Sequence, residues 1–128
     1  MSATVLSGKE LAAAIRAETT AKAAELTAAG TPPKLAVVVA TADESSAWYV
    51  RSIAKAATKV GITCDIVDLG PDASDMDIRL KLDSLSVDES VHGVILQTPL
   101  PDGVNAQDVA LAITFEKDID GANPFSLG

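Results

Sequence analysis

Residues 34–62 read KLAVVVATADESSAWYVRSIAKAATKVGI, and they decide the fold because they join a strand to a helix. The run at 34–41 is continuously apolar and β-branched, which is typical of a parallel strand covered on both faces. A helical repeat of apolar residues follows from Ser45, is capped near 43–46 and ends at Gly61. A buried strand followed directly by a helix is the repeating unit of α/β proteins.

Another helix is predicted before this strand, over residues 7–30. Ser7 is a candidate N-cap, Glu10 completes a capping box with it, and Gly30 is suited to close the helix. Apolar residues follow a broadly helical period; they are Leu11, Ala14, Ile15, Ala21 and Leu26.

Helices and strands go on alternating downstream. Strands are predicted at 63–70 and 92–97, with a helix that begins at Ser74 between them and a short helix over 106–113 after them. The connections are too long for hairpins, which implies right-handed crossovers between parallel strands. We therefore predict an α/β fold, a three-layer domain with a small, mainly parallel sheet flanked by helices. Such sheets bind ligands at the carboxyl ends of their strands.

The composition limits what the chain can be. Its 128 residues suffice for one domain, and 48% hydrophobic residues predict an ordered core. A net charge of −8 without a basic stripe argues against a nucleic-acid partner. Cys64 is the one cysteine and His92 the one histidine, so neither a disulfide within the chain nor a zinc cluster is predicted. We expect Cys64 to be a small core residue. His92 begins a buried strand, so we expect it to have a packing or capping role.

No segment predicts targeting, membrane insertion or dinucleotide binding. The first ten residues carry charge and lack the uninterrupted apolar run of a signal peptide. No apolar run approaches the roughly 20 residues that a membrane helix needs. We predict a soluble, cytoplasmic protein with no membrane partner. Neither G-x-G-x-x-G nor a P-loop occurs, so no cofactor-binding residue is predicted in this chain.

Polar side chains near the predicted strand ends are candidates for a site. Tyr49, the one tyrosine, stands at the start of a helix, where an exposed ring often contacts a ligand. Gln97 ends an apolar strand and offers a donor and an acceptor, although hydrogen bonding to the loop backbone is an equally good interpretation. Pro99 stiffens that loop. Asp118 and Asp120 fit either a solvated turn or the recognition of paired N–H groups.

Four stretches in this order and spacing are more specific than any one of them: SGKELAAAIRAE, KLAVVVATADESSAWYVRSIAKAATKVGI, VHGVILQTPLP and KDIDGANPFSLG. Together they resemble the folate-binding catalytic domain of the methylenetetrahydrofolate dehydrogenase/cyclohydrolase family. The resemblance covers essentially all of residues 1–128. It implies that the family's second domain, a Rossmann domain that binds NADP or NAD, is absent from this chain.

The resemblance also implies roles for particular residues in catalysis and substrate binding. The family's Tyr-x-x-x-Lys motif packs its tyrosine on the aminobenzoyl ring of the substrate and uses its lysine for hydrolysis. Tyr49 matches the tyrosine, but Ile53 occupies the lysine position. Gln97 matches the glutamine that assists this lysine and contacts the substrate, with Pro99 in the same motif, and Asp120 matches the aspartate that holds the pterin.

The implied function belongs to one-carbon metabolism and purine biosynthesis: oxidation of 5,10-methylenetetrahydrofolate by hydride transfer to NADP or NAD. The family then hydrolyses the methenyl product to 10-formyltetrahydrofolate. Ile53 cannot move a proton, and Lys55 projects about 120° from Tyr49 on the helix, so this cyclohydrolase activity is expected to be weak or absent. We expect the isolated chain to be inactive as a dehydrogenase and the full-length protein to be a homodimer. The alternative is a non-catalytic folate-binding or interaction module that kept Tyr49, Gln97 and Asp120.

Overall fold

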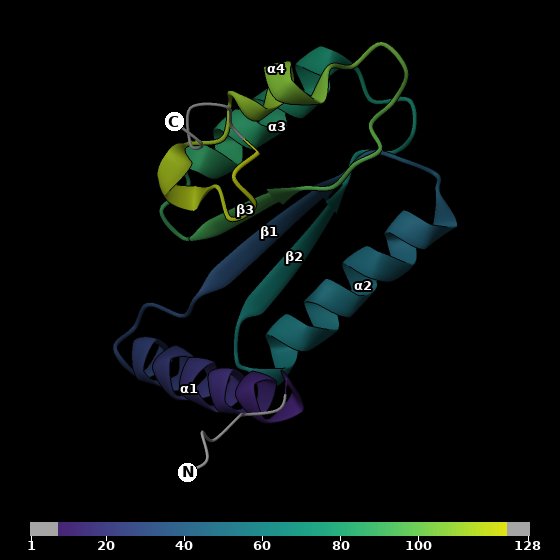
Figure 1. Cartoon of the computed structure of the whole chain (residues 1–128). Coiled ribbons are helices and arrows are strands. Elements are labelled where there is room, and N and C mark those ends of the chain that lie inside the picture. Colours follow the sequence, from purple (N-terminus) through teal and green to yellow (C-terminus); the bar gives the residue numbers. More distant parts are fainter. Residues whose placement is uncertain (1–7, 123–128) are drawn as a thin grey trace.

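The strand predicted at 34–41 forms β1 (Lys34–Val39), the central strand of a three-stranded sheet. It lies between β2 (Thr63–Asp68) and β3 (Gly93–Leu96), and both neighbours run parallel to it. The computed structural model describes residues 8–122 of the chain. Each predicted strand is present, within two residues of its expected bounds, and the prediction of a parallel sheet is confirmed (Figure 1).

The sheet is the middle of three layers, as predicted. α2 (Glu44–Lys59) covers one face, and α3 (Asp75–Val87) with α4 (Ala106–Ala110) covers the other (Figure 1). Side chains alternate between the faces of a strand, so β1 supplies both apolar clusters. The α2-side cluster contains buried Val37, Val39, Val50 and Ile95. The larger opposite cluster includes Ala36, Val38, Ile78, Leu82, Val94 and Val109.

Local sequence signals explain where the helices begin. At α2 the Asp43 carboxylate accepts hydrogen bonds from the hydroxyl and the backbone N–H of Ser46. These bonds hold the pKa of Asp43 below its usual value, because they favour the charged carboxylate. At α3 the helix was predicted to begin at Ser74, and this N-cap residue forms a reciprocal capping box with Asp77. Both caps satisfy backbone N–H groups that would otherwise lack partners in the first turn.

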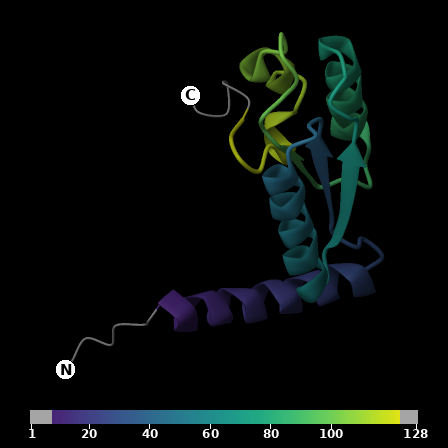
Figure 2. The same cartoon turned by 90° about the vertical axis from the view of Figure 1, so that its right-hand side faces the viewer.

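α1 (Gly8–Ala28) forms where a helix was predicted, but its apolar face is not covered. Ala23 is its one buried residue among those described, and it packs beside Gly61 at the end of α2. Leu11 and Ile15 remain exposed because the first half of α1 projects away from the sheet (Figure 2). The predicted N-cap, Ser7, lies outside the described residues.

The last part of the described chain differs from expectation. α4 ends at Ala110 rather than at residue 113, although Ile113 is still fully buried. The short 3-10 helix η1 (Phe115–Lys117), which was not predicted, follows. The Lys117 ammonium donates hydrogen bonds to two carbonyl oxygens at the end of α3, at 3.3 Å from Leu85 O and 2.7 Å from Asp88 O. These two bonds fix the position of η1 against the end of α3. No sequence pattern close to Lys117 predicts them, because their partners lie about thirty residues earlier.

Candidate functional site

The carboxyl ends of β1 and β3 lie beside the start of α2. The backbone N–H of Gln97 donates to Val38 O at 2.9 Å, so the pairing of β3 with β1 extends to this residue. The buried Ser46 hydroxyl of α2 lies 3.5 Å from Thr98 O. The structure thus brings the first turn of α2 against the loop that carries Gln97 and Pro99.

Tyr49 follows Ser46 by three residues and therefore shares a side of α2 with it. Its side chain is 52% exposed. The Tyr49 carbonyl accepts a hydrogen bond from the Ser52 hydroxyl within the helix. The ring is therefore available to a ligand.

Ile53 packs toward the sheet rather than into solvent. Its side chain is half-buried and contacts the α2-side cluster defined above. Val50, Ala57 and Val60 are buried on neighbouring turns and form an apolar stripe with Ile53. Tyr49 and Ile53 lie about 40° apart around the helix. The position one turn after Tyr49 is therefore occupied by a core-like side chain that cannot accept or donate a proton.

Gln97 and Pro99 lie in the loop after β3. Gln97 is half-buried, and its side-chain amide donates to Thr98 O at 3.0 Å. Hydrogen bonding to the loop backbone was one of the two roles that the sequence suggested for Gln97. The bond fixes where the amide group lies. The Thr98–Pro99 peptide bond is cis.

Asp118 and Asp120 belong to the turn 118–121 that follows η1. Asp118 forms a parallel bridge with Val94 of β3, and its carboxylate accepts from the backbone N–H of Ala122 at 2.8 Å. Gly121 has φ +67°, which favours glycine. Asp120 is exposed on this turn. The paired Val94 precedes Gln97 by three residues, or about 10 Å along an extended strand.

Gly93 sets the position of this turn. A Cβ atom at Gly93 would overlap the side chain of Ile119, which lies over it next to Asp120. We expect Gly93→Ala to lower the free energy of unfolding by about 1 kcal/mol, because the added methyl group must displace Ile119. Urea unfolding should show this loss and its reversal in a Gly93→Ala/Ile119→Ala double variant. Additive losses in the double variant would show that this contact does not position the turn.

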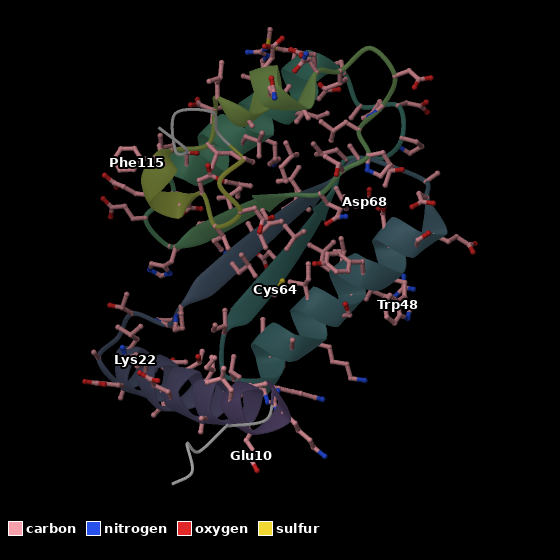
Figure 3. The ribbon with its side chains drawn as sticks, in the orientation of Figure 1. Glu10, Lys22, Trp48, Cys64, Asp68 and Phe115 are labelled. Carbon is pink, nitrogen blue, oxygen red and sulfur yellow. The ribbon has the colours of Figure 1, made fainter. Side chains whose placement is uncertain are left out.

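Cys64 and His92 have structural surroundings. The His92 ring accepts a hydrogen bond from the backbone N–H of Lys34 at 3.1 Å, as expected of a capping residue. Cys64 is half-buried and points into the space between β2 and α2 (Figure 3). Burial, assisted by the charge of Asp65, raises the pKa of the Cys64 thiol and so disfavours the reactive thiolate.

A groove of about 690 Å³ lies between α1 and α2, away from most of the predicted site. We call it the α1–α2 groove; it is lined by Ile15, Arg16, Thr19, Leu35, Ser52, Ile53, Lys55, Ala56, Ala57, Lys59 and Val60. Of the predicted site residues only Ile53 lines it. Cavity volume reflects shape alone, whereas the strand ends carry the polar groups, so the candidate site remains at the carboxyl edge of the sheet.

The turns between strands and helices do not fit a dinucleotide. The β1–α2 connection contains no glycine, and the connections after β2 and β3 contain one each, Gly70 and Gly103. A dinucleotide pyrophosphate needs several glycines in such a turn for close backbone approach. Within residues 8–122 no three potential ligand side chains gather to hold a metal ion. No helix in the same range is long and apolar enough to cross a membrane.

The carboxyl edge of this parallel sheet brings Ser46 of α2 against the loop of Gln97, and α/β domains commonly bind ligands at that edge. Residues 6–120 match the family "Tetrahydrofolate dehydrogenase/cyclohydrolase, catalytic domain". The chain belongs to this family, which confirms the resemblance seen in the sequence.

Relatives extend the comparison. The chain is 65% identical over 123 residues to "Bifunctional protein FolD 1" of Saccharopolyspora erythraea, and the match covers 96% of this chain and 42% of the relative. The fold matches the crystal structure of the bifunctional enzyme FolD from Campylobacter jejuni with a TM-score of 0.90 and 33% identity, covering 94% and 43% of the two chains. It matches the Trypanosoma brucei dehydrogenase-cyclohydrolase complexed with NADP and inhibitor with a TM-score of 0.87 and 29% identity, covering 98% and 43%. The chain thus spans less than half the length of these proteins.

Proposed function

We propose that this chain is the folate-binding catalytic part of a 5,10-methylenetetrahydrofolate dehydrogenase whose cyclohydrolase activity is weak or absent. Ile53 is the observation that carries this proposal. It lies one turn from Tyr49, packs on the α2-side cluster and occupies the position where the family motif has its hydrolytic lysine. Family membership supports the folate substrate, and the packing of Ile53 supports the loss of one of two reactions.

The two reactions need different groups. Hydride transfer mainly requires that the reacting carbon be held in position, which packing and hydrogen bonds achieve. In our proposal Tyr49 supplies the stacking face, Gln97 contacts the substrate beside Pro99, and Asp120 holds the pterin through charge-assisted hydrogen bonds. Hydrolysis additionally requires a group that moves protons, and Ile53 cannot do so.

The hydride acceptor belongs to a part of the protein outside this chain in our proposal. The Trypanosoma brucei relative was solved with NADP. The strand-to-helix turns described above do not fit a dinucleotide, so we propose that NADP or NAD is bound by a second, Rossmann-type domain. Assembly of the whole protein as a homodimer remains a prediction.

A second candidate function is a folate-binding module without catalysis. The same observation favours it, because Ile53 removes an ionisable group while Tyr49, Gln97 and Asp120 are kept. Measuring hydride transfer in a protein that carries both domains separates the candidates, since the non-catalytic module would bind folate and transfer no hydride.

Removing the Asp120 carboxylate should weaken folate binding. We expect Asp120→Ala to lower the affinity for 5-formyltetrahydrofolate about 10-fold, since a charge-assisted hydrogen bond contributes roughly 1–3 kcal/mol. Titration calorimetry on the 128-residue chain is the measurement. Asp102→Ala is a matched control, because Asp102 is likewise exposed in a loop and is not a predicted site residue. Equal affinity of wild type and Asp120→Ala would remove Asp120 from the site.

A further inference from the structure

Ser86, near the end of α3, joins this helix to the segment that follows α4. Its hydroxyl donates a hydrogen bond to Ala112 O at 2.8 Å and accepts one from the backbone N–H of Thr114 at 3.1 Å. The side chain is buried, with 7% of Ser86 exposed. Burying a hydroxyl costs free energy unless it is hydrogen-bonded, and here it acts as both donor and acceptor. Ser86 therefore fixes where residues 112–114 cross the helix.

Lys117 makes a second connection to the same end of α3. Its ammonium group lies 2.7 Å from Asp88 O and 3.3 Å from Leu85 O. The last carbonyl groups of a helix carry the negative end of its dipole, so a cation beside them is stabilising. The Lys117 side chain is half-buried, which reduces the screening of this interaction by solvent. The end of α3 thus holds residues 112–117 at both ends, through Ser86 at the first and Lys117 at the last.

Asp120 follows Lys117 by three residues, and the backbone of its turn determines where it lies. The side chain is exposed, and within residues 8–122 no N–H or O–H group donates a hydrogen bond to its carboxylate. On one side the turn is held by β3, through the bridge between Asp118 and Val94. On the other side it continues directly from residues 112–117. The position of the Asp120 carboxylate therefore depends on two supports, which are β3 and the end of α3.

We propose that Ser86 and Lys117 are positioning residues for the carboxylate of Asp120. Neither side chain needs to touch the ligand, because each acts by holding residues 112–117 against α3. This inference rests on the proposed function, which assigns the pterin to Asp120. Hydrogen bonds weaken steeply when their distance or angle departs from the preferred geometry. A small displacement of the turn is therefore enough to weaken the bonds between Asp120 and a pterin.

The test begins with two single substitutions in the 128-residue chain. Ser86→Ala removes the buried hydroxyl, and Lys117→Met removes the ammonium group while it keeps an unbranched side chain. Titration calorimetry with 5-formyltetrahydrofolate should show each variant binding about 3- to 10-fold more weakly than wild type. The loss should not exceed the roughly 10-fold loss expected of Asp120→Ala, because both substitutions act through that carboxylate.

Coupling to Asp120 distinguishes positioning from a general loss of structure. In the Asp120→Ala background, Ser86→Ala and Lys117→Met should each change the affinity by less than about 2-fold, because no carboxylate is left to position. A substitution that only loosens the domain would weaken binding by the same factor in both backgrounds. The double-mutant cycle therefore measures the positioning role itself.

α3 offers a matched control for each substitution. Ser84→Ala removes an exposed hydroxyl two residues before Ser86, and Lys81→Met removes the ammonium group of a lysine that is half-buried like Lys117. Neither side chain is hydrogen-bonded to residues 112–117 within the described part of the chain. Both control variants should keep the wild-type affinity. Circular dichroism and thermal unfolding of all variants show whether the helices are retained.

Several results would overturn the inference. Wild-type affinity in Ser86→Ala or in Lys117→Met would remove that residue from the positioning role and leave the proposed function intact. Equal losses with and without the Asp120 carboxylate would show a general loosening of the domain instead. Wild-type affinity in Asp120→Ala would remove Asp120 from the site and this inference with it. Failure of the wild-type chain to bind 5-formyltetrahydrofolate would contradict the proposed function as well.

Discussion

Replacing Ile53 by lysine should raise the rate of methenyltetrahydrofolate hydrolysis by about 10- to 100-fold. The substitution returns an ammonium group to the side of α2 that carries Tyr49. General acid–base catalysis contributes roughly 100- to 10,000-fold when the pKa and the position of the group are tuned, so an untuned lysine should recover part of this. The decay of methenyltetrahydrofolate absorbance, corrected for buffer-catalysed hydrolysis, is the measurement, and hydride transfer in a two-domain protein should persist.

The lysine stem can stay on the apolar stripe while its ammonium reaches solvent, so Ile53→Lys should fold. Thr58→Lys is the matched control, because it adds the same charge to an exposed position of α2 on another side of the helix. Rapid hydrolysis by the wild-type protein would contradict the proposal that Ile53 makes hydrolysis slow, since another group would then perform the proton transfers. A gain of equal size in Thr58→Lys would show that added positive charge alone is responsible.

Truncating Leu82 should cost about 3 kcal/mol of the free energy of unfolding. Leu82 is fully buried in the cluster between the sheet, α3 and α4. Leucine-to-alanine changes at such positions cost roughly 2–5 kcal/mol, because they lose buried area and leave a cavity. That is a large part of the roughly 5–15 kcal/mol that stabilises a typical domain. Urea unfolding followed by circular dichroism measures it.

Leu80→Ala provides the matched comparison. Leu80 lies on the same helix, two residues away, and is 60% exposed. Its truncation should change the free energy of unfolding by about 0.5 kcal/mol or less, as is usual at the surface. Similar losses at positions 80 and 82 would mean that α3 presents a different face to the sheet.

The sequence predicted the sheet well because its signals are local. The β-branched run of β1 and the caps Asp43 and Ser74 report backbone structure within a few residues of themselves. Parallel order followed from alternation and connection length. The packing of Ile53 on the sheet can be predicted in the same way, because its place in an apolar stripe depends only on helical spacing from Val50 and Ala57.

Long-range contacts could not be predicted in the same way. Two carbonyl groups about thirty residues earlier in the chain hold η1 through Lys117, and no pattern near Lys117 signals them. Apolar spacing predicted the helix α1, but burial depends on what lies opposite, and among the described residues of α1 only Ala23 is buried. The Ser46–Thr98 contact likewise joins segments far apart in the sequence.

Trp48, the single tryptophan, precedes Tyr49 and projects from the outer side of α2 with 66% of its side chain exposed (Figure 3). An exposed indole emits at longer wavelengths than a buried one, and its emission responds to aromatic groups that approach it. The native chain therefore contains its own optical reporter beside the candidate site. Fluorescence can follow ligand arrival there on the stopped-flow time scale without any dye or added label.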